Sequence, residues 1–265
     1  MNQPRREFLK TSIVVSAATL TGLSASGETA PTGREYYELR AYRLKPDASH
    51  DLLDGYLEKA LIPALNARGI ASVGVFTEPE SKDGPAVWVL IPHPTLASIG
   101  EVTASLNADP AVVTAGAAYF DPALKDNPAF DRIDSWLFVA FAGLPRLVVP
   151  ELTRAGKPRI LELRTYESFN EVKALKKVDM FNAGEVEVMQ EVGLSPVFFG
   201  QALAGSGLPQ LTYMLCGPDR EAHKEHWTGF LNHPVWIALK SDPQYADTVS
   251  KITARFLVPK PYSQI

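Results

Sequence analysis

The sequence has a single cysteine, Cys216, among its 265 residues, so no disulfide can form within the chain. Cys216 follows a run of strand-forming residues, and we expect it to be a small core residue rather than a nucleophile. The sequence also lacks the glycine-rich motifs of dinucleotide and phosphate sites, the G-x-S-x-G motif of serine hydrolases and the C-x-x-C motif. These absences argue against nucleotide-dependent and serine-hydrolase chemistry.

Basic clusters and long apolar runs are missing as well. The net charge is −4, and lysines and arginines are spread along the chain. A mildly acidic chain of this kind is not expected to bind nucleic acid or an anionic membrane surface. No run reaches the roughly 20 apolar residues of a transmembrane helix, so we expect no membrane span in the mature chain.

The N-terminal segment has the layout of an export signal. Arg5-Arg6-Glu7-Phe8-Leu9-Lys10 is a full R-R-x-F-L-K signature, and a weakly apolar stretch and small residues follow it up to Ala30. Residues 1–30 therefore resemble a twin-arginine signal peptide. We predict a periplasmic protein whose precursor binds the twin-arginine export machinery. Removal of this segment takes away three basic and two acidic residues and changes the net charge from −4 to −5.

One sequence pattern occurs twice, with its copies 124 positions apart. Glu38-Leu39-Arg40-Ala41-Tyr42 returns as Glu162-Leu163-Arg164-Thr165-Tyr166. Three further landmarks, Gly69, Pro85 and Pro110, return at the same spacing as Gly193, Pro209 and Pro234. Such a constant spacing indicates duplication of one unit of about 100 residues. We call residues 34–142 the first half and residues 158–262 the second half, with residues 143–157 as the linker.

Hydrophobic periodicity predicts the order β-α-β-β-α-β in each half, which is the ferredoxin-like order. In the first half, strands are predicted at 36–44, 70–77, 86–91 and 136–142, with helices at 46–69, 96–106 and 110–118, and a kink at Pro63. In the second half, strands are predicted at 159–166, 197–203, 211–216 and 252–258, with helices at 171–192 and 219–240. The helices cover only one face of each sheet, and the bare apolar face needs a partner. We therefore predict an α+β fold in which two tandem ferredoxin-like repeats pack sheet to sheet as an α/β barrel within one chain.

Two segments resemble the NIPSNAP domain. They are the E-L-R-x-Y strand followed by Leu44-Lys45-Pro46-Asp47, and the helical segment W-T-G-F-L-N-H-P-V-W from Trp227 to Trp236. The resemblance covers nearly the whole mature chain as two copies. It implies the dimeric α/β-barrel superfamily, which includes cofactor-free monooxygenases, dye-peroxidase-like haem enzymes and small lyases. It implies no general reaction, and it leaves the cofactor of this chain unknown. A homo-oligomer is compatible with it.

The duplicated strands carry the candidate ligand-binding residues. Alternate side chains of a strand share a face, so each strand presents one glutamate, one arginine and one tyrosine together. These six candidates are Glu38, Arg40, Tyr42, Glu162, Arg164 and Tyr166. If the apolar side of each strand meets the helices, both sets face the barrel interior. There an arginine binds a carboxylate or enolate and a tyrosine donates a proton. The simpler alternative is that each glutamate and arginine satisfy one another and fix the strand register.

Histidines and tryptophans near the C-terminus supply weaker signals. His223 and His226 lie three positions apart on a predicted helix, but no acidic residue completes a metal site of three or four ligands. We expect this helix face to be solvated, and we predict no metal site. A haem ligand among the five histidines rests on analogy with the superfamily alone. Trp227 and Trp236 are expected to pack in the core.

Two classes of function follow. In the first, the chain binds a small organic ligand in the barrel interior, as a monooxygenase- or lyase-like protein would. In the second, it is a non-catalytic interaction module whose barrel is filled by side chains. An interior pocket of roughly 300 Å³ or more, bordered by Arg40 or Arg164, would favour ligand binding.

Overall fold

The computed structural model describes residues 33–46 and 49–265, so the predicted signal peptide lies outside the described residues. The first half contains β1 (Tyr36–Arg43), α1 (Asp51–Tyr56), η1 (Leu57–Leu61), α2 (Ile62–Asn66), β2 (Gly74–Thr77), β3 (Ala86–His93), α3 (Leu96–Asn107), α4 (Pro110–Ala115), η2 (Pro122–Asp126) and β4 (Arg132–Ala140). The linker contains α5 (Glu151–Arg154). The second half contains β5 (Ile160–Glu167), α6 (Glu171–Met180), η3 (Phe181–Glu185), α7 (Val186–Glu191), β6 (Pro196–Ala204), β7 (Gln210–Gly217), α8 (Arg220–Leu231), α9 (Pro234–Ser241), η4 (Pro243–Tyr245) and β8 (Lys251–Pro259).

The strands form a closed barrel in the order β1-β3-β2-β8-β5-β7-β6-β4, and their pairings are antiparallel. Each half contributes four neighbouring strands, β4-β1-β3-β2 and β6-β7-β5-β8. The halves join where β2 pairs with β8 and where β4 pairs with β6. A closed barrel leaves no free sheet edge. The predicted fold class is therefore confirmed.

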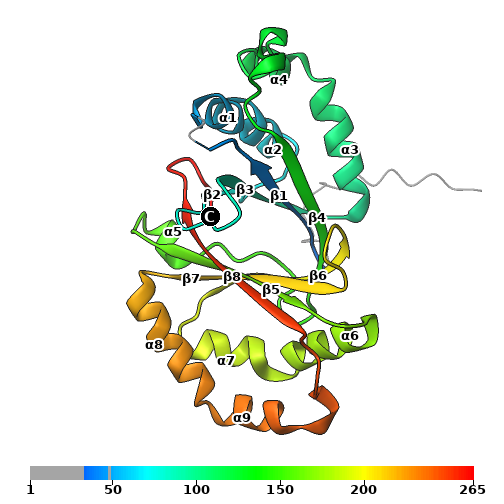
Figure 1. Cartoon of the computed structure of the whole chain (residues 1–265), viewed down its shortest axis with the longest axis vertical. Coiled ribbons are helices and arrows are strands. Elements are labelled where there is room, and N and C mark those ends of the chain that lie inside the picture. Colours follow the sequence, from blue (N-terminus) through cyan, green and yellow to red (C-terminus); the bar gives the residue numbers. More distant parts are fainter. Residues whose placement is uncertain (1–32, 47–48) are drawn as a thin grey trace, which may run out of the picture. The chain divides into compact units, whose positions relative to one another are not determined.

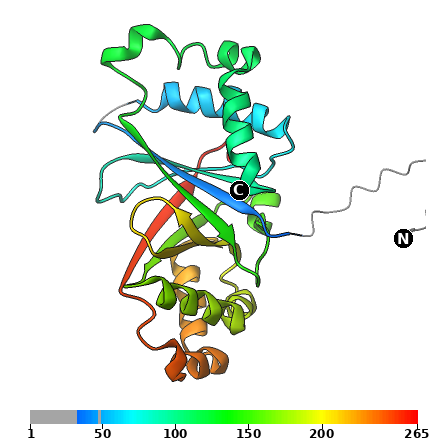
Figure 2. The same ribbon diagram turned by 90° about the vertical axis from the view of Figure 1, so that its right-hand side faces the viewer.

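The helices of the two halves lie on opposite sides of the barrel (Figure 1), and the view turned by 90° shows the same arrangement (Figure 2). Three buried clusters result. One lies between the first-half helices and strands and includes Leu53, Leu61 and Tyr42. A second lies between the second-half helices and strands and includes Phe181. The third fills much of the barrel interior with side chains from both halves, including Leu39.

The first helical run of each half is interrupted by one π turn at the same place. These turns are η1 and η3, and their first residues, Leu57 and Phe181, again lie 124 positions apart. In the first half the predicted kink takes this form, because Pro63 follows the turn and has no N–H to donate. In the second half Gly184 adopts a φ of 140° inside the turn. The π turn therefore occurs in both halves and does not depend on the proline alone.

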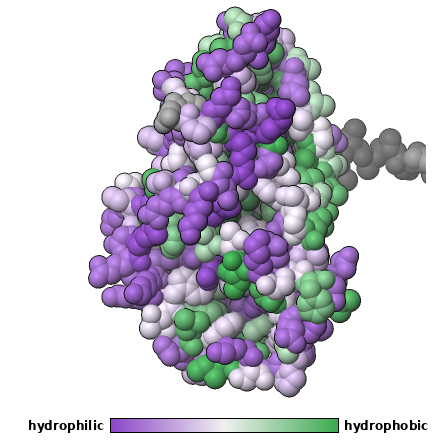
Figure 3. All heavy atoms as spheres, viewed as in Figure 1, coloured by the Kyte–Doolittle hydropathy of each residue, from purple (hydrophilic) through white to green (hydrophobic). Residues whose placement is uncertain are grey.

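Hydrophilic residues cover most of the face seen in Figure 3, with hydrophobic residues scattered among them. Within the described part of the chain, no helix is both long and apolar enough to cross a membrane.

Candidate functional site

The polar residues of β1 and β5 face the helices and not the barrel interior, so the predicted orientation is wrong. Leu39 and Leu163 belong to the cluster inside the barrel, whereas Tyr42 and Tyr166 belong to the two helix-facing clusters. Alternation along a strand then places the glutamates and arginines on the helix-facing side as well. The two polar sets therefore lie on opposite outer faces of the barrel and do not meet in one central cavity.

In the first half, Glu38 and Arg40 satisfy one another. Arg40 donates from Nε and Nη2 to the two carboxylate oxygens of Glu38, each at 2.7 Å, and Ser135 donates to the same carboxylate at 3.1 Å. Burial alone would raise the pKa of Glu38, but the hydrogen bonds and charge of Arg40 outweigh it and lower the pKa. In the first half this bidentate pair matches the simpler alternative, in which the glutamate and the arginine of one strand satisfy one another. Tyr42 packs edge-on against Phe130 beside it.

In the second half, two side chains of helix α8 hydrogen-bond to the corresponding glutamate, Glu162. Asp219 caps α8 by accepting from the backbone N–H of Ala222, which fixes the start of the helix. One turn apart on α8, His223 and Trp227 both reach Oε2 of Glu162, from Nε2 at 2.8 Å and Nε1 at 2.7 Å. Because a carboxylate only accepts, Nε2 of His223 carries the hydrogen of this bond. His223 is 1% exposed, so the expectation of a solvated helix face is wrong.

The hydrogen bonds from α8 hold Glu162 as a carboxylate. Burial raises its pKa, but the hydrogen bond from His223, the charge of Arg164 and the hydrogen bond from Trp227 together lower it. Trp227, expected to be a core residue, is thus also a hydrogen-bond donor.

Arg164 is consequently left with unused donors. Its Nε lies 3.2 Å from Oε1 of Glu162, but this nitrogen is buried and makes no hydrogen bond to any described residue. The guanidinium carbon lies 4.3 Å from the centre of the Trp227 ring, and the side chain is 21% exposed. An arginine stacked on an aromatic ring with free N–H groups is suited to bind an oxyanion from solvent.

The two halves differ at the positions that surround the two arginines. Helices α3 and α8 begin 124 positions apart, so His223 and Trp227 correspond to Ile99 and Thr103. Ile99 has no side-chain donor, and the Thr103 hydroxyl donates to the carbonyl of Ile99 at 2.8 Å, so Glu38 remains with Arg40. The differences at these two positions of α8 therefore separate Arg40, which donates twice to its glutamate, from Arg164, which makes no hydrogen bond to its glutamate.

A buried ion pair adjoins Arg164 and Tyr166. Lys177 of α6 pairs with Glu185 of the π turn η3, and both side chains are at most 4% exposed. The Lys177 ammonium lies 4.7 Å from the ring centre of Phe181 and 5.3 Å from that of Trp236. Burial lowers the pKa of Lys177 and raises the pKa of Glu185, although each partner opposes the shift of the other.

Two tyrosine hydroxyls complete the cluster. Tyr213 of β7 donates to the hydroxyl of Tyr166 at 2.9 Å. Burial raises the pKa of both phenols, so both stay protonated at neutral pH. Because the Tyr166 oxygen accepts from Tyr213, its own hydrogen is available for a ligand.

Sequence patterns did not predict Lys177, Glu185, Tyr213 or the role of His223. One signal was present, because the positions 124 residues before Lys177 and Glu185 are Leu53 and Leu61. Apolar core positions that become charged in one copy mark where the copies differ in role.

The remaining chemistry-bearing groups do not extend this site. Among residues 33–46 and 49–265, no group of three or more His, Cys, Asp or Glu side chains is placed to hold a metal ion. Cys216 is buried in the barrel interior, where burial raises the pKa of its thiol to about 11.

Comparison with known proteins supports the fold and places one domain. Residues 161–264 match the model of the NIPSNAP family, and this segment is the second half with its buried polar cluster. A comparison with curated protein sequences finds no match.

Solved structures with a similar fold include two described as putative monooxygenases. The one from Fusobacterium nucleatum has a TM-score of 0.56 at 7% identity and covers 86% of this chain and 93% of its own. The one from Lactobacillus acidophilus has a TM-score of 0.57 at 8% identity and covers 85% of this chain and 94% of its own. An uncharacterized NIPSNAP-like domain protein from Burkholderia xenovorans covers 40% of this chain and 88% of its own, with a TM-score of 0.35 at 18% identity. At these identities the likeness to the two putative monooxygenases shows a shared fold and no more.

Proposed function

We propose that this chain is an exported protein that binds a small organic anion at Arg164, between the strands and helices of the second half. The observation that carries the proposal is the contrast between the two arginines. Arg40 donates twice to its glutamate, whereas Arg164 keeps only an ion pair with Glu162 and makes no hydrogen bond to it, since Glu162 accepts from His223 and Trp227 of α8. A buried donor without a partner is costly and is retained where a ligand satisfies it.

The surrounding groups favour a carboxylate or an enolate. The planar guanidinium binds two oxygens side by side. The Tyr166 hydroxyl supplies a further donor beside it, since the arginine lies 5.9 Å from the tyrosine ring centre. The Trp227 ring gives the arginine an apolar backing that excludes water.

A reaction of the monooxygenase or lyase type would begin from such a bound anion. The Tyr166 hydroxyl would donate a hydrogen bond to an enolate oxygen, and Arg164 would balance its charge. Both roles need only groups that the second half already holds. The chain would act as a plain binding protein if no further group reacted.

The test compares Arg164→Met with the matched Arg40→Met. Protein purified from its native host would be analysed by absorption spectroscopy and mass spectrometry for a retained small molecule. We expect wild type and Arg40→Met to retain it and Arg164→Met to lose it. Arg164→Met loses the stacking contact and the ion pair with Glu162, but Glu162 still accepts hydrogen bonds from His223 and Trp227, so this variant should lose less stability than Arg40→Met. Arg40→Met should lose about 3 kcal/mol, because Glu38 stays buried without its arginine.

Two results would count against this site. Retention of the ligand by Arg164→Met would put the binding site elsewhere. A stability loss in Arg164→Met as large as in Arg40→Met would show that Arg164 is structural. In that case the non-catalytic interaction module becomes the better reading, and the many side chains that fill the barrel interior already favour it.

We also propose twin-arginine export and a tandem origin of the two halves. The R-R-x-F-L-K segment supports export, and Arg5→Lys with Arg6→Lys should leave the precursor in the cytoplasm. Normal localisation of this double variant would contradict the route. The repeated spacing of 124 between η1 and η3 and between α4 and α9 supports duplication of a NIPSNAP-like unit.

A further inference from the structure

The two ends of the barrel differ. Towards the starts of β1 and β5 the interior is filled by apolar side chains, and Tyr37 packs on Phe198 with ring centres 5.1 Å apart. Towards the ends of β1 and β5 the interior is hollow. The cavity there has a volume of about 180 Å³. It is smaller than the roughly 300 Å³ that would favour ligand binding at the predicted residues, and neither Arg40 nor Arg164 lines it.

The two halves give this cavity different walls. The first half contributes apolar and aromatic residues, Leu39, Trp88, Trp136 and Phe138. The second half contributes Leu163 and a polar set, Thr165, Gln210, Thr212 and Thr253. Trp88 and Thr212 lie 124 positions apart and so occupy equivalent places in the two copies.

The tryptophans form a flat wall with their polar atoms already engaged. The rings of Trp88 and Trp136 are stacked at 20° with centres 6.1 Å apart. Trp136 donates to the carbonyl of Ser206 at 3.0 Å, and Trp88 donates to Glu78 at 3.3 Å. A flat apolar ligand can therefore pack here without leaving an indole N–H unsatisfied.

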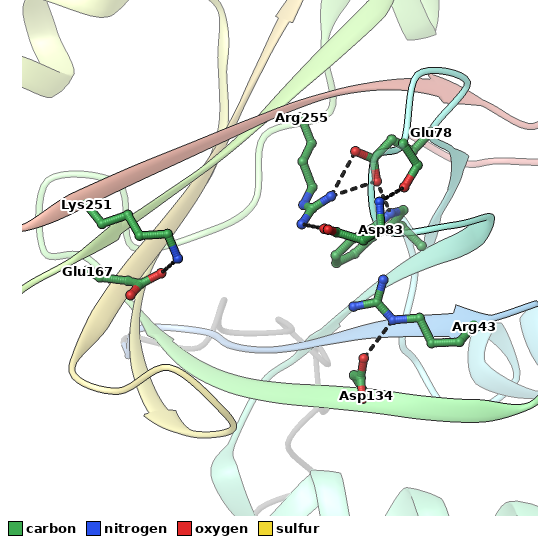
Figure 4. A network of polar contacts seen from close by, with 9 residues as sticks. Arg43, Glu78, Asp83, Asp134, Glu167, Lys251 and Arg255 are labelled. Atoms are coloured by element: carbon green, nitrogen blue, oxygen red, sulfur yellow. Dashed lines mark hydrogen bonds and ion pairs between the residues drawn. The ribbon is translucent and has the colours of Figure 1, made fainter.

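Charged side chains surround the mouth of the cavity (Figure 4). All of those named below form ion pairs, and all but one leave no buried nitrogen without an acceptor. Arg255 donates to Glu78 at 2.9 Å and to Asp83 at 2.5 Å, and Lys251 pairs with Glu167 at 2.7 Å. These pairs form a polar rim that can admit a polar group while the floor stays apolar.

Arg43 is the exception on this rim. Its Nε donates to Asp134 at 2.7 Å, but its Nη1 is buried and has no partner among the described residues. Figure 4 shows the guanidinium turned towards the space between Lys251 and Arg255. A ligand that carries a carboxylate would give this nitrogen an acceptor.

We propose that this open end of the barrel is a second binding site, which takes a single-ring aromatic carboxylate. A cavity of about 150 Å³ lined by apolar side chains is known to hold one benzene ring, and the present cavity is slightly larger. The ring packs between the two tryptophans and Leu163, and the carboxylate meets Arg43 at the rim. The site is separate from Arg164, which lies on the outer face of the barrel.

The test uses benzoate as the probe and benzyl alcohol as its uncharged analogue. Binding to the purified protein would be measured by calorimetry and by ligand-observed NMR. Arg43→Met is compared with Arg68→Met, because each arginine pairs with an aspartate at 2.7 Å and is about equally exposed, 27% and 24%. We expect Arg43→Met to weaken benzoate binding about 10- to 100-fold and to leave benzyl alcohol binding unchanged. Arg68→Met should match wild type for both.

A second variant tests the cavity itself. Thr212→Trp restores the residue of the other copy and fills the space, so a folded variant should lose both ligands. Its melting curve shows whether it folds. If it does not fold, the comparison of benzoate binding by Arg43→Met and Arg68→Met tests the proposal. The proposal is overturned if wild type shows no saturable benzoate binding by ~10 mM, or if Arg43→Met and Arg68→Met behave alike. It is also overturned if Arg164→Met abolishes benzoate binding while Arg43→Met does not.

Discussion

The buried pair Lys177–Glu185 offers a stability test with an internal reference. The first half places Leu53 and Leu61 at the equivalent positions, and both leucines are fully or almost fully buried. The apolar version therefore fits this helix and its π turn. We predict that Lys177→Leu alone destabilises the protein by about 3–5 kcal/mol, since it leaves Glu185 buried without a partner.

The double variant Lys177→Leu with Glu185→Leu should recover most of this loss. Replacing a buried ion pair by apolar residues of similar volume is often neutral or stabilising by about 1–4 kcal/mol. The single variant should thus lower Tm by on the order of 10 °C, while the double variant should melt close to wild type. Urea unfolding monitored by circular dichroism would measure the free energy of unfolding of wild type, Lys177→Leu, Glu185→Leu and the double variant.

The single variant should also depend on pH in a defined direction. Burial raises the pKa of Glu185 even beside Lys177. A carboxyl with a raised folded-state pKa stabilises the folded state below its unfolded pKa, and this stability is lost as pH rises through the folded pKa. Lys177→Leu should therefore be least impaired at acidic pH. Equal stability of the single and double variants would refute the buried-charge reasoning.

Three further predictions follow from the second-half cluster and the barrel core. Trp227→Phe removes a hydrogen bond to the Glu162 carboxylate and should lower the free energy of unfolding by about 1.5–3 kcal/mol. The shift of the urea midpoint measures this loss, and an unchanged midpoint would show that the bond contributes nothing. Because the pKa values of Glu38 and Glu162 are lowered in the folded protein, the stability they provide is present above their unfolded pKa and lost as pH falls through the folded values. Melting curves from pH 7 to about 3 should show this loss, and Glu162→Gln should reduce it; identical acid sensitivity in the variant would contradict the assignment. Burial raises the pKa of Cys216 to about 11. Its thiol should therefore resist an aromatic disulfide reagent at pH 8 in the folded protein and react fully in urea. Fast reaction of the folded protein would show that solvent reaches the thiol.

Most of the fold could be predicted from the sequence because the main strand and helix signals of the first half recur in the second at a spacing of 124 positions. The sequence did not show that the polar residues of β1 and β5 face the helices, and the reason is physical. In an open sheet the polar face meets water, but here both faces are buried, one by helices and the other by the opposite side of the barrel. Alternation along β5 shows that Glu162 and Arg164 share a face without showing which layer covers it. That layer is identified only by long-range partners such as His223, which is 61 positions away from Glu162.

Fusion of the two halves matters for both proposed sites. A barrel made from two identical chains has two-fold symmetry, so each residue at its open end would appear twice. Trp88 would then face a second Trp88, and the space that Thr212 leaves open would be filled. In a single chain the copies can differ, so one supplies the aromatic wall and the other the hydroxyl groups. The same freedom lets Arg40 donate twice to Glu38 while His223 and Trp227 of α8 donate to Glu162 beside Arg164. The asymmetry is therefore what leaves Arg164 without a hydrogen bond to its glutamate and one end of the barrel hollow.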